Sequence, residues 1–229
     1  MTHPTSLQHE IHDTPEETEQ LARTWHSPRG FPGWFTQVNQ RMIGRRFIIT
    51  GFIFFLLAGV LGLLIRTQLA GPEQQFLDPG LYNQFFTMHG TVMMFFFAIP
   101  VMEGFAIYVV PLMVGTRDMA FPRLNAFGYY IYLIGGIVLF GSLLVGMAPD
   151  AGWFYYVPLA GKEYSPGYGV DIWTTMITFI EVSALTAAVE LIVTILRLRA
   201  PGMALNRMPP FVWAALVMSF PPLSSVVPC

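Results

Sequence analysis

One histidine and three glutamates lie in apolar stretches of this sequence, and their side chains are the ones best suited to chemistry. His89 stands at the start of an apolar run that extends to Ile99, and Glu103, Glu181 and Glu190 lie in later apolar runs. Ionisable side chains in such runs are costly and usually serve a function. A neutral imidazole can bind a metal or a haem iron. The structural alternative for His89 is a hydrogen bond to a neighbouring helix or to interfacial water.

The glutamates are either proton-carrying groups or neutral packing acids, because a buried carboxylate takes up a proton or finds a partner. Two polar stripes recur at helical spacing: Thr174, Thr178 and Glu181, and Ser183, Thr186 and Glu190. Glu181 and Glu190 are nine residues apart, which places them about 180° apart around a helix. Hydroxyl stripes also join membrane helices to one another, so a proton path and helix packing both stay open. Gly104, next to Glu103, favours a close helix contact there.

The composition indicates an integral membrane protein. Hydrophobic residues make up 54% of the chain and charged residues 11%, with a mean hydropathy of +0.53. Soluble domains carry about 25% charged residues, and a net charge of -2 gives no reason to expect a nucleic-acid partner. The single cysteine, Cys229, excludes an internal disulfide and a thiolate metal cluster.

Apolar runs of about 20 residues, the length that spans a bilayer, predict the elements that position these residues. Four full spans are expected, and a fifth begins near Pro210 and is interrupted by Pro221 and Pro222. The fold class is therefore an all-α, multi-pass transmembrane helix bundle with four full helices and an incomplete fifth. The expected full spans are Phe47–Ile65, Phe85–Val114, Tyr129–Met147 and Ile172–Leu196.

The chain is expected to divide into three parts. Residues 1–40 form an acidic N-terminal tail and pre-membrane segment, with the first 20 residues expected to be disordered because they are polar and lack apolar periodicity. Residues 41–217 form the membrane domain. Residues 218–229 do not continue a helix well, and we interpret them as an aberrant or truncated C-terminal tail. A natural truncation, a frameshift and a mis-called gene are the alternative origins.

Arginine and lysine positions predict the topology. Arginines are concentrated before the first span, between the second and third, and between the fourth and fifth, whereas the other two loops hold only Arg66 and Lys162. By the positive-inside rule the N-terminus is cytoplasmic. His89 is then expected at the outer end of the second span, and Asp118 on the inner side just after it.

Several blocks of sequence together resemble subunit I of the haem–copper terminal oxidases, of the cytochrome c oxidase type. The resemblance extends from about Arg45 to Val217, and the order of the blocks matches the first five helices of that twelve-helix fold. The most specific part is Asp-Met-Ala-Phe-Pro-Arg at 118–123. The blocks are Met88–Gly90 with Met93–Phe96, Pro111–Asn125, Gly152–Leu159 and Arg199–Met203.

The resemblance implies a haem site. His89 matches one of the two axial ligands of the low-spin haem, which is haem a in the closest type. Arg66 resembles an arginine beside that haem, and Trp153 a tryptophan near the propionates. Without the family, Arg66 reads as a snorkelling cation and Trp153 as an aromatic-belt anchor. Gly90 would let a flat macrocycle approach, although glycine also serves ordinary helix contact.

The resemblance also implies a proton channel. Asp118 matches the aspartate at the inner mouth of the main proton-uptake channel, Asn125 the asparagine that follows, and Ser183 a channel-lining serine. Without the family, Asp118 reads as part of a loop ion pair. The family often has an asparagine where this chain has Ile107 and another at Glu190, so the channel is lined differently here, and proton pumping is not carried over. The family often has a glycine at Glu181, and it suggests no role for Glu103.

No histidine follows His89, so the second axial ligand, the ligand of the oxygen-reducing haem and the copper ligands are absent from this sequence. The expected function is the N-terminal part of the catalytic subunit of a respiratory cytochrome c oxidase in a bacterial plasma membrane, inactive alone. Its expected partners are membrane lipid, subunits II and III, and cytochrome c. The alternatives are a quinol oxidase fragment, a non-catalytic haem-binding or assembly membrane protein, and a proton or ion carrier.

Overall fold

The computed structural model describes residues 15–24, 30–73 and 75–225, which belong to two compact units, Met1–Gln37 and Val38–Cys229. The first unit contains helices α1 (Pro15–Thr24) and α2 (Gly30–Thr36). The expected disorder is wrong for Pro15–Gln20, which are helical. Pro15 begins α1 and Glu16 follows in its first turn, where the helix dipole favours negative charge. Residues 1–14 lie outside the described part.

Four helices of the second unit are long and apolar enough to span a membrane, which confirms the all-α multi-pass prediction. All four begin earlier than the apolar runs, and polar caps start two of them: Asn39 Oδ1 accepts a hydrogen bond from the Arg41 amide at 2.9 Å, and Asp78 Oδ2 accepts one from the Gly80 amide at 3.0 Å. The spans are α3 (Gln40–Gln68), a joint span of α4 (Pro79–Thr91), η1 (Val92–Ala98) and α5 (Ile99–Val114), α6 (Pro122–Leu144), and α7 (Gly169–Arg197).

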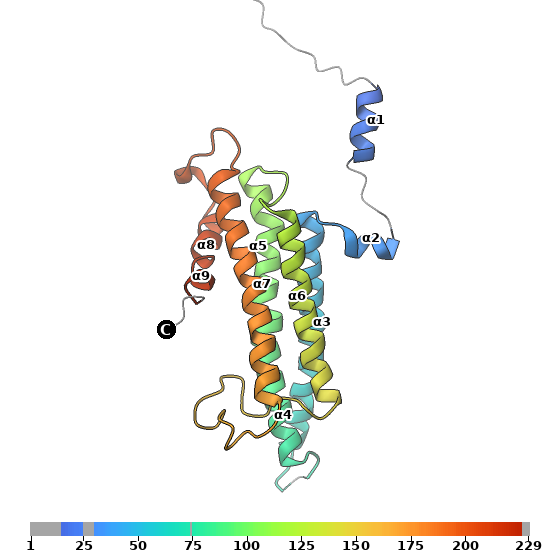
Figure 1. Cartoon of the computed structure of the whole chain (residues 1–229), viewed down its shortest axis with the longest axis vertical. Helices are drawn as coiled ribbons and strands as arrows, with labels where there is room; N and C mark the ends of the chain where they lie inside the picture. Colours follow the sequence, from blue (N-terminus) through green and yellow to red (C-terminus); the bar gives the residue numbers. More distant parts are fainter. Residues whose placement is uncertain (1–14, 25–29, 74, 226–229) are drawn as a thin grey trace, which may run out of the picture. The chain divides into compact units, whose positions relative to one another are not determined.

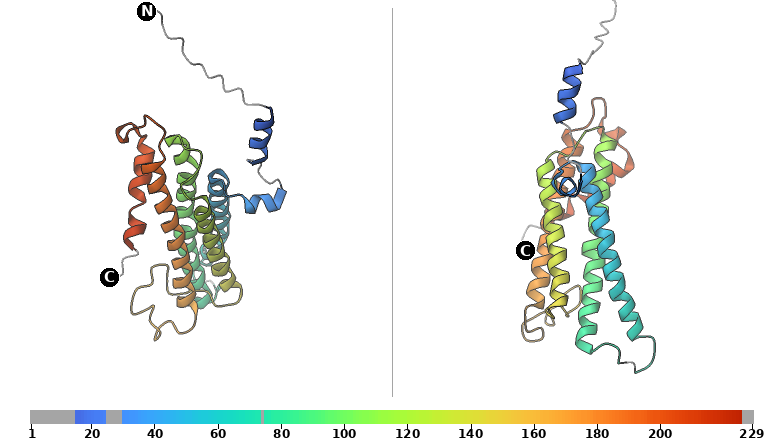
Figure 2. Two further views of the ribbon diagram at one scale, coloured as in Figure 1. Left: turned by 45° about the horizontal axis from the view of Figure 1, so that its top comes forward. Right: turned by 90° about the vertical axis from the view of Figure 1, so that its right-hand side faces the viewer.

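The spans pack as two close pairs, α3 with the α4–α5 span and α6 with α7 (Figure 1; Figure 2, right). Glycines make both contacts possible. A Cβ atom on Gly44 would lie 2.8 Å from the Gly104 carbonyl oxygen, and one on Gly128 would lie 2.4 Å from Thr186 Oγ1. The close helix contact predicted at Gly104 is therefore present.

The interruption of the fifth helix is confirmed. Helix α8 (Pro210–Met218) ends just before the two prolines that start the short helix α9 (Pro221–Ser225). A short 3₁₀ turn, η2 (Leu205–Arg207), precedes α8. Together α8 and α9 are shorter than a membrane span.

The second span contains a π-helical segment that the sequence analysis did not predict. Residues Val92–Ala98 form η1, directly before Pro100. Proline has no amide hydrogen to donate to the carbonyl four residues earlier, which here is the Phe96 carbonyl. Tyr132 of α6 donates its hydroxyl to that carbonyl at 2.7 Å, and its side chain is fully buried. A tyrosine of the aromatic core thus supplies a hydrogen bond to the carbonyl that Pro100 leaves without its helical donor.

We predict that Tyr132→Phe lowers the free energy of unfolding by about 1–3 kcal/mol, the typical effect of leaving a buried carbonyl unsatisfied. Reversible unfolding in mixed micelles, followed by circular dichroism, measures the change. Tyr156→Phe is the control, because Tyr156 is 71% exposed. Equal stability of the two variants would contradict the assigned role of this hydrogen bond.

Candidate functional site

His89 is held by one hydrogen bond to the backbone of α3. Its Nδ1 lies 2.8 Å from the Ala58 carbonyl oxygen. A carbonyl can only accept, so Nδ1 carries the hydrogen and donates it, and a neutral ring then presents Nε2 as its unprotonated nitrogen. This arrangement turns the atom that coordinates metals away from the hydrogen bond and fixes the tautomer in which it can do so.

Gly62 makes room for this ring. A Cβ atom at position 62 would lie 2.9 Å from Cε1 of His89 and 3.2 Å from its Nδ1. The Ala58 carbonyl points along α3 toward residue 62, so a side chain there would stand between the carbonyl and the imidazole. Sequence reasoning missed both Ala58 and Gly62. The only available signal for Gly62 was a small residue in an apolar helix.

Gly90 leaves room for the side chain of a loop residue. A Cβ atom at this position would lie 2.8 Å from Cδ1 of Trp153, so the indole packs directly on the helix beside His89. We expected the missing side chain of Gly90 to let a flat macrocycle approach the helix. In this structure the Trp153 indole ring occupies the space beside Gly90. The packing also brings Trp153 next to His89 in space, although 64 positions separate them in the sequence.

Three further contacts hold the loop that carries Trp153. The Gly152 amide donates to Thr87 Oγ1 at 2.9 Å, which ties the loop to α4. Trp173 Nε1 of α7 donates to Thr91 Oγ1 at 2.9 Å, and the Tyr155 ring stacks on Trp173 at 4.3 Å between centroids. Hydroxyls of α4 therefore bind partners on both sides of His89. None of these partners could be inferred from spacing alone.

Arg66 lies in the last turn of α3 and is exposed. It is one helical turn beyond Gly62, on the same face of the helix. It therefore stands about 6 Å along the axis from the position that His89 contacts, toward the end of α3. This places Arg66 near His89 without a direct contact.

Asp118 lies in the loop between α5 and α6, at the opposite end of the bundle. Its Oδ1 accepts hydrogen bonds from the amides of Gln40 (3.2 Å) and Met119 (2.8 Å). Burial raises the pKa of Asp118 above its usual value, and those two amides and the charge of Arg117 offset part of the rise. The amide of Gln40 belongs to the first turn of α3, where a helix binds an anion.

A polar column continues from this end of the bundle between α6 and α7. Asn125 and Ser183 are almost fully buried, and Asn125 Nδ2 and Ser183 Oγ have no hydrogen-bond partner. Thr186 donates to the Ser183 carbonyl at 2.7 Å, and its hydroxyl lies against Gly128. The structure therefore places Asn125 on α6 and Ser183 on α7, two helices that pack against one another. Buried polar atoms without partners are sites that water usually satisfies.

The two acids of α7 face opposite sides, as their spacing predicted. Glu190 is fully buried, and both of its carboxyl oxygens lack a hydrogen-bond partner. Glu181 is exposed on the face that also carries Thr174 and Thr178. Those threonines donate to carbonyls one turn earlier in their own helix. The stripe that contains Glu181 is therefore exposed, whereas the stripe that contains Glu190 packs against α6.

Within the described residues no group of three or more His, Cys, Asp or Glu side chains is placed to hold a metal ion. A metal site that uses His89 therefore needs a flat ligand that completes most of the coordination itself, as a porphyrin does, or further protein ligands from outside the described part.

The sequence matches a family model over residues 42–228, described as cytochrome c and quinol oxidase polypeptide I. The chain belongs to this family. The matched residues extend beyond Val217, where the resemblance in the sequence analysis ended. The match confirms that the chain is an N-terminal portion of an oxidase subunit I and thus part of a multi-pass membrane protein.

Among curated proteins, the chain is 44% identical to cytochrome c oxidase subunit 1 of Corynebacterium glutamicum over 199 residues, which is 86% of this chain and 34% of the relative. It is also 44% identical to cytochrome c oxidase subunit 1 of Corynebacterium efficiens over 199 residues, with the same coverage of both chains. The chain therefore spans about a third of the length of these relatives.

We predict that Gly62→Ala displaces the His89 ring, because the added methyl group would lie within 3 Å of it. Chemical-shift changes of the His89 imidazole nitrogens, measured by NMR in lipid nanodiscs, report the displacement. Gly59→Ala is the matched control on the same helix, because a Cβ atom there meets nothing within 4 Å. Unchanged His89 shifts in the Gly62 variant would contradict the proposed contact.

We also predict a pH effect at Asp118. Its pKa is raised in the folded chain, so its contribution to stability is present below the unfolded pKa and is lost as pH rises through the folded pKa. The stability of the wild type relative to Asp118→Asn should therefore fall as the pH is raised through that window. Unfolding measured across pH checks this, with Asp171→Asn at an exposed position as the control. A difference that rises with pH would contradict the burial effect.

Proposed function

We propose that this chain forms the part of a respiratory oxidase that holds one face of the low-spin haem and admits protons from the inner side. The single observation that supports the haem role best is the hydrogen bond from His89 Nδ1 to the Ala58 carbonyl. Proteins orient metal-coordinating histidines by giving the other ring nitrogen a hydrogen-bond partner. Here that partner is a helix backbone, which is rigid and cannot be titrated.

The side chains around His89 fit a haem that this chain binds on one of its two faces. His89 would coordinate the iron through Nε2, and the haem, when bound, would carry the electron. Trp153 packs beside His89 and presents an indole N–H that can donate to a propionate, and Arg66 offers a cation on the same side. The second axial ligand and the copper ligands would come from further segments, because the sequence has no histidine after His89. The expected cofactor is haem a, with copper bound only by the full-length protein.

Proton entry is the second role that we propose, with Asp118 at the inner mouth. The raised pKa of Asp118 lets it hold a proton more readily than an exposed aspartate does. Asn125 and Ser183 continue inward as unpartnered buried polar groups, which can hold water. The family often has an asparagine where this chain has the fully buried Ile107. An apolar side chain at position 107 offers no polar group on α5, so the polar groups of the proposed path are those on α6 and α7.

The setting of this function is a bacterial plasma membrane with the N-terminus in the cytoplasm, because arginines are concentrated in the loops on that side. Subunits II and III and cytochrome c would be the partners of the complete enzyme. The relatives are named as cytochrome c oxidases, whereas the family description also includes quinol oxidases. Cytochrome c is therefore the electron donor that we favour over quinol.

Coordination by His89 can be tested directly on this chain. The chain is produced with ¹⁵N-histidine in lipid nanodiscs, and ferric haem is added with unlabelled imidazole, which supplies the second axial ligand. Pulsed EPR of the low-spin iron should then show ¹⁵N hyperfine coupling, because one coordinating nitrogen comes from the protein. The coupling should be lost in His89→Ala.

The control variant replaces His3, His9, His12 and His26 with alanine, which removes every other histidine of the chain. It should keep the ¹⁵N coupling. Coupling that persists in His89→Ala, coupling that disappears in the control, or no coupling in the wild type would each overturn the proposed ligand role.

A further inference from the structure

Two buried acids remain outside the haem and proton-inlet roles described above. Glu190 of α7 is fully buried, and neither of its carboxyl oxygens has a hydrogen-bond partner. Glu103 of α5 is 8% exposed, and its Oε1 also has none. Helices α5 and α7 pack against one another. The Asn125 amide of α6 lies close enough to act on the Glu190 carboxyl group but makes no well-formed hydrogen bond with it. Hydrogen bonds within the described residues therefore leave both acids largely unsatisfied.

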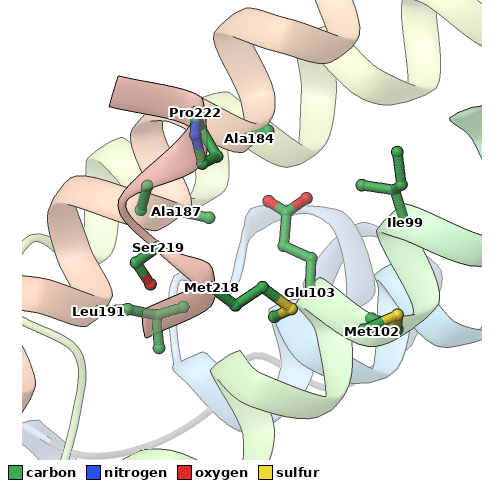
Figure 3. A pocket seen from close by; sticks show the side chains of 10 residues that line it. Ile99, Met102, Glu103, Ala184, Ala187, Leu191, Met218, Ser219 and Pro222 are labelled. Carbon is green, nitrogen blue, oxygen red and sulfur yellow. The ribbon is translucent and has the colours of Figure 1, made fainter. Parts of the chain in front are cut away.

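The two acids lie at the same level of the bundle. Glu103 lines a cavity of about 160 Å³ together with Ala187 and Leu191 of α7, and its carboxyl group points into this space (Figure 3). Ala187 and Leu191 are three positions before and one position after Glu190. Along the helix axis, Glu190 is therefore within about 5 Å of residues that face Glu103. The cavity also borders Met218 and Ser219, at the end of α8.

The charges that act on Glu190 come from two other acids, Asp118 and Glu103. Arg46 of α3 is a buried cation, and its guanidinium lies over the Tyr129 ring, 5.8 Å from the centroid. Ionising Glu190 and Glu103 together would place two like charges in a low-dielectric interior, which costs several kcal/mol for each ion. Each acid therefore holds a proton at rest and can ionise only while passing it on.

We propose that Glu190 and Glu103 form a two-acid proton relay that leads from the Asp118 end of the bundle to the cavity between α5, α7 and α8. A proton arriving from Asp118 through water protonates Glu190 as Glu190 releases its own proton toward Glu103. Glu103 then releases a proton to water in the cavity, and both carboxyl groups return to the neutral state. No electron is transferred. The relay rests on the proposed function only for its inlet at Asp118.

Infrared spectroscopy of the whole chain in lipid nanodiscs tests the relay. A protonated carboxyl group has a C=O stretching band that shifts when its hydrogen is exchanged for deuterium. Transfer to D₂O buffer should shift the bands of both acids, and Glu190→Gln and Glu103→Gln assign them. Glu103 exchanges directly with the water of the cavity, so Glu190→Gln should leave exchange at Glu103 nearly unchanged. Glu190 does not line the cavity and exchanges through its neighbours in the relay, so Glu103→Gln should slow exchange at Glu190, and Glu103→Gln together with Asp118→Asn should slow it at least tenfold.

Two further variants separate the possible outcomes. Glu181→Gln alters the exposed acid of the same helix, and it should leave both bands and both rates unchanged. Asp118→Asn alone should slow exchange at Glu190 if Asp118 is the inlet. Bands that do not exchange, or exchange at Glu190 that is unaffected by Glu103→Gln, would overturn the relay and leave the acids as packing groups. An effect of Glu103→Gln on Glu190 without any effect of Asp118→Asn would support the relay and overturn the inlet.

Discussion

The hydrogen bond between His89 Nδ1 and the Ala58 carbonyl is the interaction on which the His89 end of the bundle depends. It requires α3 to pass close to His89, which Gly62 permits, and it fixes the ring so that Nε2 is the nitrogen left to coordinate. The remaining outer contacts are arranged around that ring. Gly90 accepts Trp153, and hydroxyls of α4 bind the loop and α7. A rigid backbone partner suits the ligand role that we propose for His89, because its geometry does not change with pH.

The interior of a membrane bundle penalises every polar group without a partner, and this constraint accounts for the rest of the fold. Where the backbone is left without its helical donor, at Pro100, a buried tyrosine supplies the hydrogen bond. Among the side chains left without partners, Asn125, Ser183 and Glu190 lie on α6 and α7, and Glu103 lies on α5, which packs against α7. Such groups are costly as packing, and they are the ones that we propose as a proton path. The exposed acid Glu181 lies on the opposite face of α7 and is separate from that path.

Apolar run lengths were enough to predict the four spans and the interrupted fifth helix, because the cost of exposing backbone to lipid leaves few alternatives. Helical spacing was enough to separate Glu181 from Glu190. The partner of the π segment could not be predicted, because the Tyr132 hydroxyl that bonds the Phe96 carbonyl is 36 positions away in the sequence. The roles of Ala58 and Gly62 were also beyond reach, since a backbone carbonyl and a missing side chain carry no residue-type signal. The helix at Pro15–Gln20 was missed because polarity was given more weight than its proline start and acidic first turn.

The tautomer of His89 tests the central claim most directly. In lipid nanodiscs, at a pH where the imidazole is neutral, ¹⁵N NMR distinguishes the protonated ring nitrogen from the unprotonated one, and His89→Ala identifies the signals. The structure predicts a protonated Nδ1 that is hydrogen-bonded to the Ala58 carbonyl and an unprotonated Nε2. A protonated Nε2, or rapid exchange between the two tautomers, would contradict the account, because the ring would then not be held ready to coordinate a metal.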